Sequence, residues 1–297
     1  MTKKLVSLLL AVLMAVCLTG ACAESAARTI TDMFGREVTL TRPVNRIVVL
    51  EPGDCEILCA LGCGDALVGR GAYCDYPASV LELPVVQSGA NTNLEEILAL
   101  EPQVVIISDM AHTKEQVALL EENGVKVITT NADSIAEVYD AIRIIGRVMD
   151  KDAEAEALVS DMETTFAALA ARSEKTDKTI YFEVMPLEWG LWSAGAGTFM
   201  HELAEICGMK NAFEDLDGWQ PISQEQVIER NPDYIVLVTG MDETAVDEVL
   251  GRDGWGEIKA VAGGRVYNAD SYTLTRPAPR LKEAAIDLYN FLHDIAE

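Results

Sequence analysis

The side chains best suited to binding a small molecule are aromatic, and they follow stretches of sequence that predict β-strands. One arginine accompanies them in the last such loop. The set comprises Tyr73, Tyr76, Trp189, Trp192, Trp219, Tyr272 and Arg276. Aromatic rings form broad apolar walls, and a guanidinium group binds carboxylates or other oxygen-rich groups. We therefore expect these residues to line a site for a large, flat or macrocyclic ligand. Two alternatives stand: the tryptophans cover the edge of the core, or Arg276 forms an internal salt bridge.

Residue patterns for catalysis or metal binding are weak. Only three histidines occur, His112, His201 and His293, and they are too far apart to match metal-ligand spacings. None stands beside an activated nucleophile. The pair Gly195 and Gly197 begins a dinucleotide fingerprint, but Met200 occupies the place of its third glycine. We therefore predict no enzyme activity, no resident metal and no cofactor, apart from a ligand that is itself a metal chelate.

Cysteines form the other conspicuous pattern. Cys55, Cys59 and Cys63 recur at steps of four, which places side chains on one face of a helix. The spacing matches neither zinc sites nor ferredoxins. We expect these thiols, with Cys74 and Cys207, to pack as small apolar groups.

Composition restricts the class of protein. The 297 residues are 49% hydrophobic and 24% charged, which is typical of a globular chain with a sizeable core. The formal net charge is −25. Binding to nucleic acid requires clustered basic side chains, so we predict no nucleic-acid partner.

Residues 1–22 resemble an export signal. Lys3 and Lys4 precede an apolar run at 5–18 that is short for a membrane span, and small residues lead to Cys22. Cleavage before Cys22 would expose a thiol for lipidation, whereas ordinary signal cleavage would release the protein. In either case we expect an extracytoplasmic protein, anchored as a lipoprotein or free in the periplasm or medium.

The chain contains one long-range repeat. Residues 93–107 and 223–237 align without gaps: each begins with a capping box, passes through a short helix to a proline, and ends in an apolar run. Glu95 and Glu225 occupy the same place in the first helical turn. A carboxylate there is stabilised by the helix dipole, but its duplication indicates a paired role.

The alternation of strands and helices predicts an α/β fold with two Rossmann-like lobes and parallel-rich sheets. We assign residues 28–150 to an N-terminal lobe, 151–175 to one long linking helix and 176–297 to a C-terminal lobe. Alanine, leucine and glutamate dominate the expected helix, from Asp152 to about Glu174. The ligand cleft should lie between the lobes, at the carboxyl ends of the strands.

Several short motifs, in order, resemble one known family. They are TITDMFGREVT at 29–39, RIVVL at 46–50, EILCALG at 56–62, YCDYP at 73–77, NLE at 93–95, GAGTF at 195–199, GMKN at 208–211 and RPAPR at 276–280. Over nearly the whole exported chain, the sequence is similar to class III solute-binding proteins of ABC importers.

The resemblance implies a function and partners. Such a protein would capture a metal chelate, either a ferric siderophore or cobalamin or another corrinoid, with haem as the third choice. It would deliver the chelate to an ABC transporter permease dimer, and the resemblance assigns Glu95 and Glu225 to docking on the two permease subunits. The alternative is a metal-cluster or chelatase-like enzyme built from two α/β lobes, which would lack an export signal.

Overall fold

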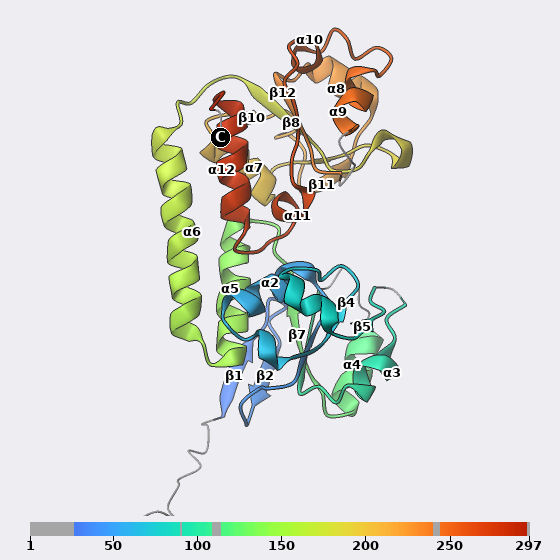
Figure 1. Ribbon diagram of the computed structural model, residues 1–297, viewed down its shortest axis with the longest axis vertical. Helices are drawn as coiled ribbons and strands as arrows, with labels where there is room; N and C mark the ends of the chain where they lie inside the picture. Colours follow the sequence, from blue (N-terminus) through green and yellow to red (C-terminus); the bar gives the residue numbers. More distant parts are fainter. Residues whose placement is uncertain (1–26, 90, 109–113, 240–243, 296–297) are drawn as a thin grey trace, which may run out of the picture.

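Two parallel sheets, one in each half of the chain, form the frame of this computed structural model (Figure 1). The structure describes residues 27–89, 91–108, 114–239 and 244–295. The predicted export signal and Cys22 therefore lie outside the described residues.

The N-terminal sheet has the strand order β5-β4-β3-β6-β7, and every neighbouring pair is parallel. Its strands are β3 (Ile47–Val49), β4 (Leu67–Gly71), β5 (Val85–Val86), β6 (Val104–Ser108) and β7 (Lys126–Thr130). The helices of this half are α2 (Pro52–Ala60), α3 (Leu94–Ala99), α4 (Lys114–Glu122) and α5 (Ile135–Met149), with single turns η1 (Gly64–Ala66) and η2 (Ala78–Glu82). A hairpin of β1 (Arg28–Thr31) and β2 (Glu37–Leu40) precedes them. Apolar runs such as β6 are buried throughout, as expected of parallel strands covered on both faces.

The C-terminal sheet has the order β10-β8-β12-β13 and is also parallel. Its strands are β8 (Thr179–Glu183), β10 (Lys210–Asn211), β12 (Tyr234–Leu237) and β13 (Val266–Asn268), and a separate antiparallel pair consists of β9 (Trp192–Ala194) and β11 (Trp219–Pro221). The helices are η3 (Leu187–Trp189), α7 (Phe199–Ile206), α8 (Gln224–Arg230), α9 (Ala245–Leu250), α10 (Lys259–Ala262), α11 (Ser271–Leu274) and α12 (Leu281–Leu292).

One long helix, α6 (Asp152–Arg172), runs along the side of the molecule from the lower sheet to the upper one (Figure 1). It contacts α5 in the first half and α7 and α12 in the second. Five buried side chains at helical spacing, from Ala155 to Leu169, form its packed face. At 1.5 Å per residue the helix is roughly 32 Å long. The helix predicted from Asp152 to about Glu174 is therefore present and ends at Arg172.

The repeat is visible as equivalent helices, α3 and α8, but their caps differ. Ser223 and Gln226 form the full capping box. Asn93 accepts from the Glu96 N–H, whereas the Glu96 carboxylate accepts instead from the Gln87 N–H at 3.2 Å. The first predicted capping box is thus only half formed, because a backbone donor from outside the helix takes the second partner.

The cysteines pack into the core, with one change to the predicted pattern. Cys55 and Cys59 lie on α2, but Gly62 has φ +75° and ends the helix before Cys63. The five cysteines of the described chain are free thiols, and all but Cys59 are buried. Among the residues described, no helix is both long and apolar enough to cross a bilayer.

Candidate functional site

A cavity of about 780 Å³ lies between the two halves of the molecule. In the N-terminal sheet the strand order reverses between β3 and β6, and in the C-terminal sheet between β8 and β12. Such reversal points open a crevice at the carboxyl ends of the strands. Glu51 and Ser108 line the cavity at the first reversal, and Val184 and Thr239 line it at the second. The predicted position of the cleft is therefore correct, and its volume suits a sizeable small molecule.

Carboxyl groups line the N-terminal side of the cavity. Asp54, in the first turn of α2, is only 5% exposed and accepts a hydrogen bond from the Thr130 hydroxyl at 2.6 Å. Burial raises the pKa of Asp54 to about 7, the Thr130 hydrogen bond opposes the rise, and the charge of Glu51 adds to it. Burial also raises the pKa of Glu51, against a hydrogen bond with Ser108. Each carboxyl group therefore holds its proton more tightly than it would in water.

Two tryptophans form part of the C-terminal wall. Trp192 and Trp219 both line the cavity, but they belong to the paired strands β9 and β11 rather than to loops, so that part of the prediction is wrong. The Trp219 ring packs edge-on against Phe199, with ring centroids 5.4 Å apart. Its indole Nε1 donates to Asp133 Oδ1 at 2.9 Å. Trp219 is therefore held by both halves of the chain.

Further polar contacts join the halves near Trp219. The Phe199 N–H donates to the Asp133 carbonyl at 2.5 Å, and the Ile135 N–H donates to Glu202 Oε2 at 2.6 Å. The beginning of α5 is thus hydrogen-bonded to α7 of the other half.

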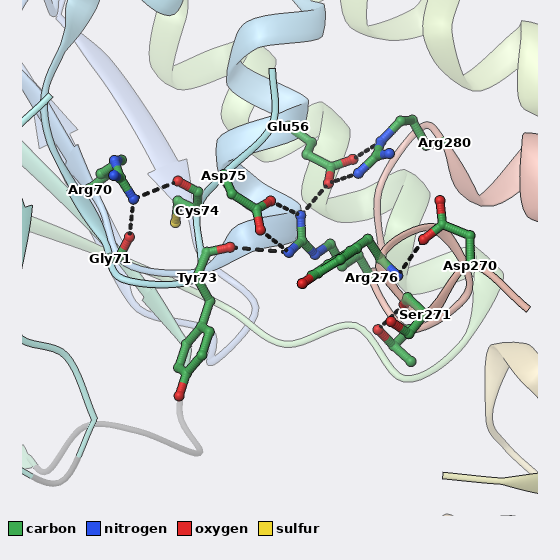
Figure 2. A network of polar contacts seen from close by, with 12 residues as sticks. Glu56, Arg70, Gly71, Tyr73, Cys74, Asp75, Asp270, Ser271, Arg276 and Arg280 are labelled. Carbon is green, nitrogen blue, oxygen red and sulfur yellow. Dashed lines mark hydrogen bonds and ion pairs between the residues drawn. The ribbon is translucent and has the colours of Figure 1, made fainter. Parts of the chain in front are cut away.

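On another side of the cavity, an ionic network joins α2 to the segment before α12. Figure 2 shows the Glu56 carboxylate between the guanidinium groups of Arg276 and Arg280. Arg276 donates to Glu56 at 3.0 Å and to Asp75 at 2.6 Å, and Arg280 donates to Glu56 at 2.6 Å. Glu56 is 3% exposed, so these charges are compensated inside the protein. Hydrogen bonds from Arg276 hold the pKa of Asp75 below its ordinary value.

Arg276 therefore has the internal salt bridges that were the alternative to a ligand-binding role. Its side chain also lines the cavity, with its guanidinium carbon 4.7 Å from the centroid of the Tyr272 ring. Arg276 also donates to the Tyr73 carbonyl at 3.1 Å, and this hydrogen bond positions the loop that carries Tyr73.

Five of the seven residues predicted from sequence are among those that line the cavity: Tyr73, Trp192, Trp219, Tyr272 and Arg276. The other two lie outside that lining. The Tyr76 ring packs against Arg280, whose guanidinium carbon is 3.8 Å from the ring centroid. Trp189 lies in η3 and is 69% exposed.

Sequence reasoning missed the acidic side of the cavity and one further aromatic ring. The missed residues include Glu51, Asp54, Ser108, Thr130, Asp133 and Phe199. Glu51 follows β3, and Ser108 is the last residue of β6. The sequence feature that could have identified them is their position at the end of a buried apolar run.

Glu95 and Glu225 are exposed and lie in the first turns of α3 and α8, outside the cavity lining. Both helices lie on the side of the molecule away from α6, one in each half (Figure 1). A hydrogen bond with Ser223 lowers the pKa of Glu225.

Residues 47–273 match the family model described as "Periplasmic binding protein". An uncharacterised ABC transporter substrate-binding lipoprotein of Bacillus subtilis, YvrC, is 34% identical over 88% of this chain and 83% of its own length. The vitamin B12-binding protein of Salmonella choleraesuis is 28% identical over 84% of this chain and 91% of its own. Among solved structures, the periplasmic heme-binding protein RhuT of Roseiflexus is similar with a TM-score of 0.76 and 27% identity, covering 85% of this chain and 99% of that one.

Proposed function

The chain belongs to the periplasmic binding protein family of solute-binding transport proteins, and on this basis we propose that it captures a metal chelate outside the cytoplasm. We propose further that it delivers the chelate, chemically unchanged, to an ABC permease. The observation that carries the proposal is the cavity of about 780 Å³ at the strand reversals of both sheets. Because the cavity lies between the halves, a ligand contacts both of them and can change the surface that a partner meets at the rim of the cavity.

The aromatic lining supports a chelate with a broad apolar surface. Trp192, Trp219 and Phe199 come from the C-terminal half, and Tyr73 and Tyr272 stand near the opposite ionic network. Flat rings of this kind pack well against a macrocycle. We propose a corrinoid as the first ligand to test, because several relatives are named vitamin B12-binding proteins.

Ferric siderophores and haem are the other two classes. A ferric siderophore would use the same apolar walls. Haem would need an axial ligand, which Tyr73 or Tyr272 could supply, since His201 and His293 lie outside the lining and His112 is not among the described residues.

We also propose that Glu95 and Glu225 contact the permease. Their exposure, their equivalent places in α3 and α8 and their position on one side of the molecule support this role. Exposed ion pairs are individually weak and are screened by salt, so such docking would depend on ionic strength.

For the membrane, we propose a lipid anchor on Cys22. Wild-type protein should incorporate labelled palmitate and appear in the membrane fraction. The substitution Cys22→Ala should abolish the labelling and move the protein to the soluble extracytoplasmic fraction. Unlabelled wild-type protein in the soluble fraction would instead indicate ordinary signal cleavage.

Tryptophan fluorescence tests the ligand proposal directly. Purified protein is titrated with cyanocobalamin, ferric siderophores and haemin, and we expect saturable quenching by one class at micromolar concentration. Trp219→Phe should reduce the quenching and leave the part that comes from Trp192, whereas the matched control Trp189→Phe, outside the cavity lining, should retain all of it. Absence of quenching by all three classes, checked by equilibrium dialysis, would contradict the proposal.

A further inference from the structure

We infer that the cavity selects a chelate with a positive charge or with hydrogen-bond donors on its rim, and that it disfavours anionic chelates. This inference rests on the proposed function, because it concerns the ligand of the same cavity. The charges and polar atoms of the lining carry it.

The first step is the balance of charge around the cavity. Among the residues that line it, the carboxyl side chains are Glu51, Asp54 and Asp133, and the basic side chain is Arg276. Arg276 is already ion-paired with Glu56 and Asp75. Its positive charge is therefore compensated before any ligand arrives, and the acidic side of the cavity has no basic lining residue in the described chain to balance it.

The second step is the hydrogen-bonding capacity of these carboxyl groups. An ionised carboxylate accepts hydrogen bonds and cannot donate them. Asp54 accepts from Thr130, and Asp133 accepts from Trp219 and Asn131. A carboxylate can accept several bonds, so amide N–H or ammonium groups on a ligand can add to these. A carboxylate or catecholate on the ligand could bond only to a protonated Asp54 or Glu51, and it would lose that bond as these groups ionise with rising pH.

The third step is the size of the discrimination. The repulsion energy of two like charges about 6 Å apart, at an effective dielectric constant of about 20, corresponds to a roughly hundredfold increase in Kd. Burial of Asp54 keeps bulk water from weakening this repulsion. We therefore expect at least a tenfold preference for the less negative of two otherwise identical ligands.

The site also predicts how affinity depends on pH. Thr130 and Glu51 act directly on Asp54, and the other titratable or charged groups that line the cavity are Asp133, Arg276, Tyr73 and Tyr272. A bound cation favours the ionised carboxylate, so it displaces the Asp54 proton, whose pKa in the free protein is about 7. Affinity for a cation should therefore rise from pH 6 to pH 8, by at most tenfold per pH unit.

Three pairs of ligands test the inference, each pair sharing one chelate but differing in charge. They are cyanocobalamin and its monocarboxylic acid, ferrioxamine B and its N-acetyl derivative, and haemin dimethyl ester and haemin. In whichever pair binds, we expect the less negative member to bind at least tenfold more tightly at pH 7.5. Equal affinities, or preference for the more negative member, would overturn the charge selectivity while leaving the proposed function standing. Failure of all six to bind would overturn both.

Variants locate the selectivity in the named residues. Asp54→Asn and Glu51→Gln should each reduce the preference by about threefold or more, and Asp54→Asn should flatten the pH dependence. Glu82→Gln is the matched control, since Glu82 is exposed in η2 and outside the lining. Circular dichroism establishes that each variant is folded. A folded Asp54→Asn, Glu51→Gln double variant with undiminished preference would overturn the assignment to these carboxyl groups.

Discussion

Replacing Asp54 by asparagine should stabilise the protein, and more so at pH 8 than at pH 5. The Asp54 carboxyl group is 5% exposed, and its pKa is raised from 3.8 to about 7, chiefly by burial. Because the folded pKa lies above the unfolded one, the unfolded state ionises first as pH rises. Folding stability is therefore lost progressively between about pH 4 and pH 7, which is the reverse of a salt-bridged aspartate.

The magnitude follows from the pKa of about 7 that Asp54 has in the folded protein. Each pH unit between the two pKa values costs about 1.4 kcal/mol, and two such units separate pH 5 from the folded pKa of about 7. Asparagine has the shape of the protonated acid and can keep the hydrogen bond from Thr130. The gain in the free energy of unfolding should thus be about 3 kcal/mol larger at pH 8 than at pH 5.

Urea unfolding followed by tryptophan fluorescence at the two pH values measures this difference. Comparing the gain at pH 8 with the gain at pH 5 cancels effects of the substitution that do not depend on pH. Glu82→Gln, at an exposed position, should show no difference between the two conditions. If Asp54→Asn changes stability equally at pH 5 and pH 8, the carboxyl group titrates near its ordinary pKa and the reasoning is refuted.

Three further results are expected. Trp219→Ala should reduce both the ligand affinity and the stability of the protein. The free energy of unfolding should fall by roughly 2–4 kcal/mol because a half-buried ring and its hydrogen bond are lost, and Trp219→Phe should reduce it less. An unchanged midpoint of thermal unfolding in Trp219→Ala would contradict this. Glu56→Gln should destabilise by about 3 kcal/mol in urea unfolding, because the buried Arg276 and the partly buried Arg280 lose their shared carboxylate, and a neutral effect would show that the network contributes nothing. Glu95→Ala with Glu225→Ala should leave ligand affinity intact but slow transport in reconstituted vesicles, more than either change alone. The difference from wild type should be largest at low salt, because salt screens the ion pairs in the wild type; wild-type transport by the double variant would disprove docking through these residues.

The frame of the fold was predictable because its signals are local. Buried β-branched runs, a glycine after α2 and after α7, and the capping residue Ser223 each act within a few positions of where they occur. The long helix α6 is likewise specified by its own alanine-rich composition.

The errors arose where contacts distant in sequence decide the structure. Trp192 and Trp219 were expected in loops, but residues 192–194 pair with residues 219–221, and no local pattern predicts that register. The Gln87 N–H competes for the carboxylate that was expected to complete a capping box.

For the site, the sequence identified most of the aromatic lining, because aromatic residues after strands are conspicuous. It did not identify Asp54, because an aspartate in a first helical turn is ordinary and only tertiary structure buries it. Its partner Thr130 lies 76 positions away. The ion pairs of Arg276 likewise reach over 200 positions along the chain.

The polar contacts on two sides of the cavity limit what a receptor can sense. Glu56 with its two arginines joins the halves at one place, and Asp133 with Trp219 joins them at another. Opening the cleft widely would break buried ion pairs, so filled and empty molecules should have nearly the same outline in solution scattering. A receptor would then distinguish cargo-bearing molecules by the cargo's own surface at the mouth of the cleft, or by small rearrangements at its rim, and little by the angle between the lobes.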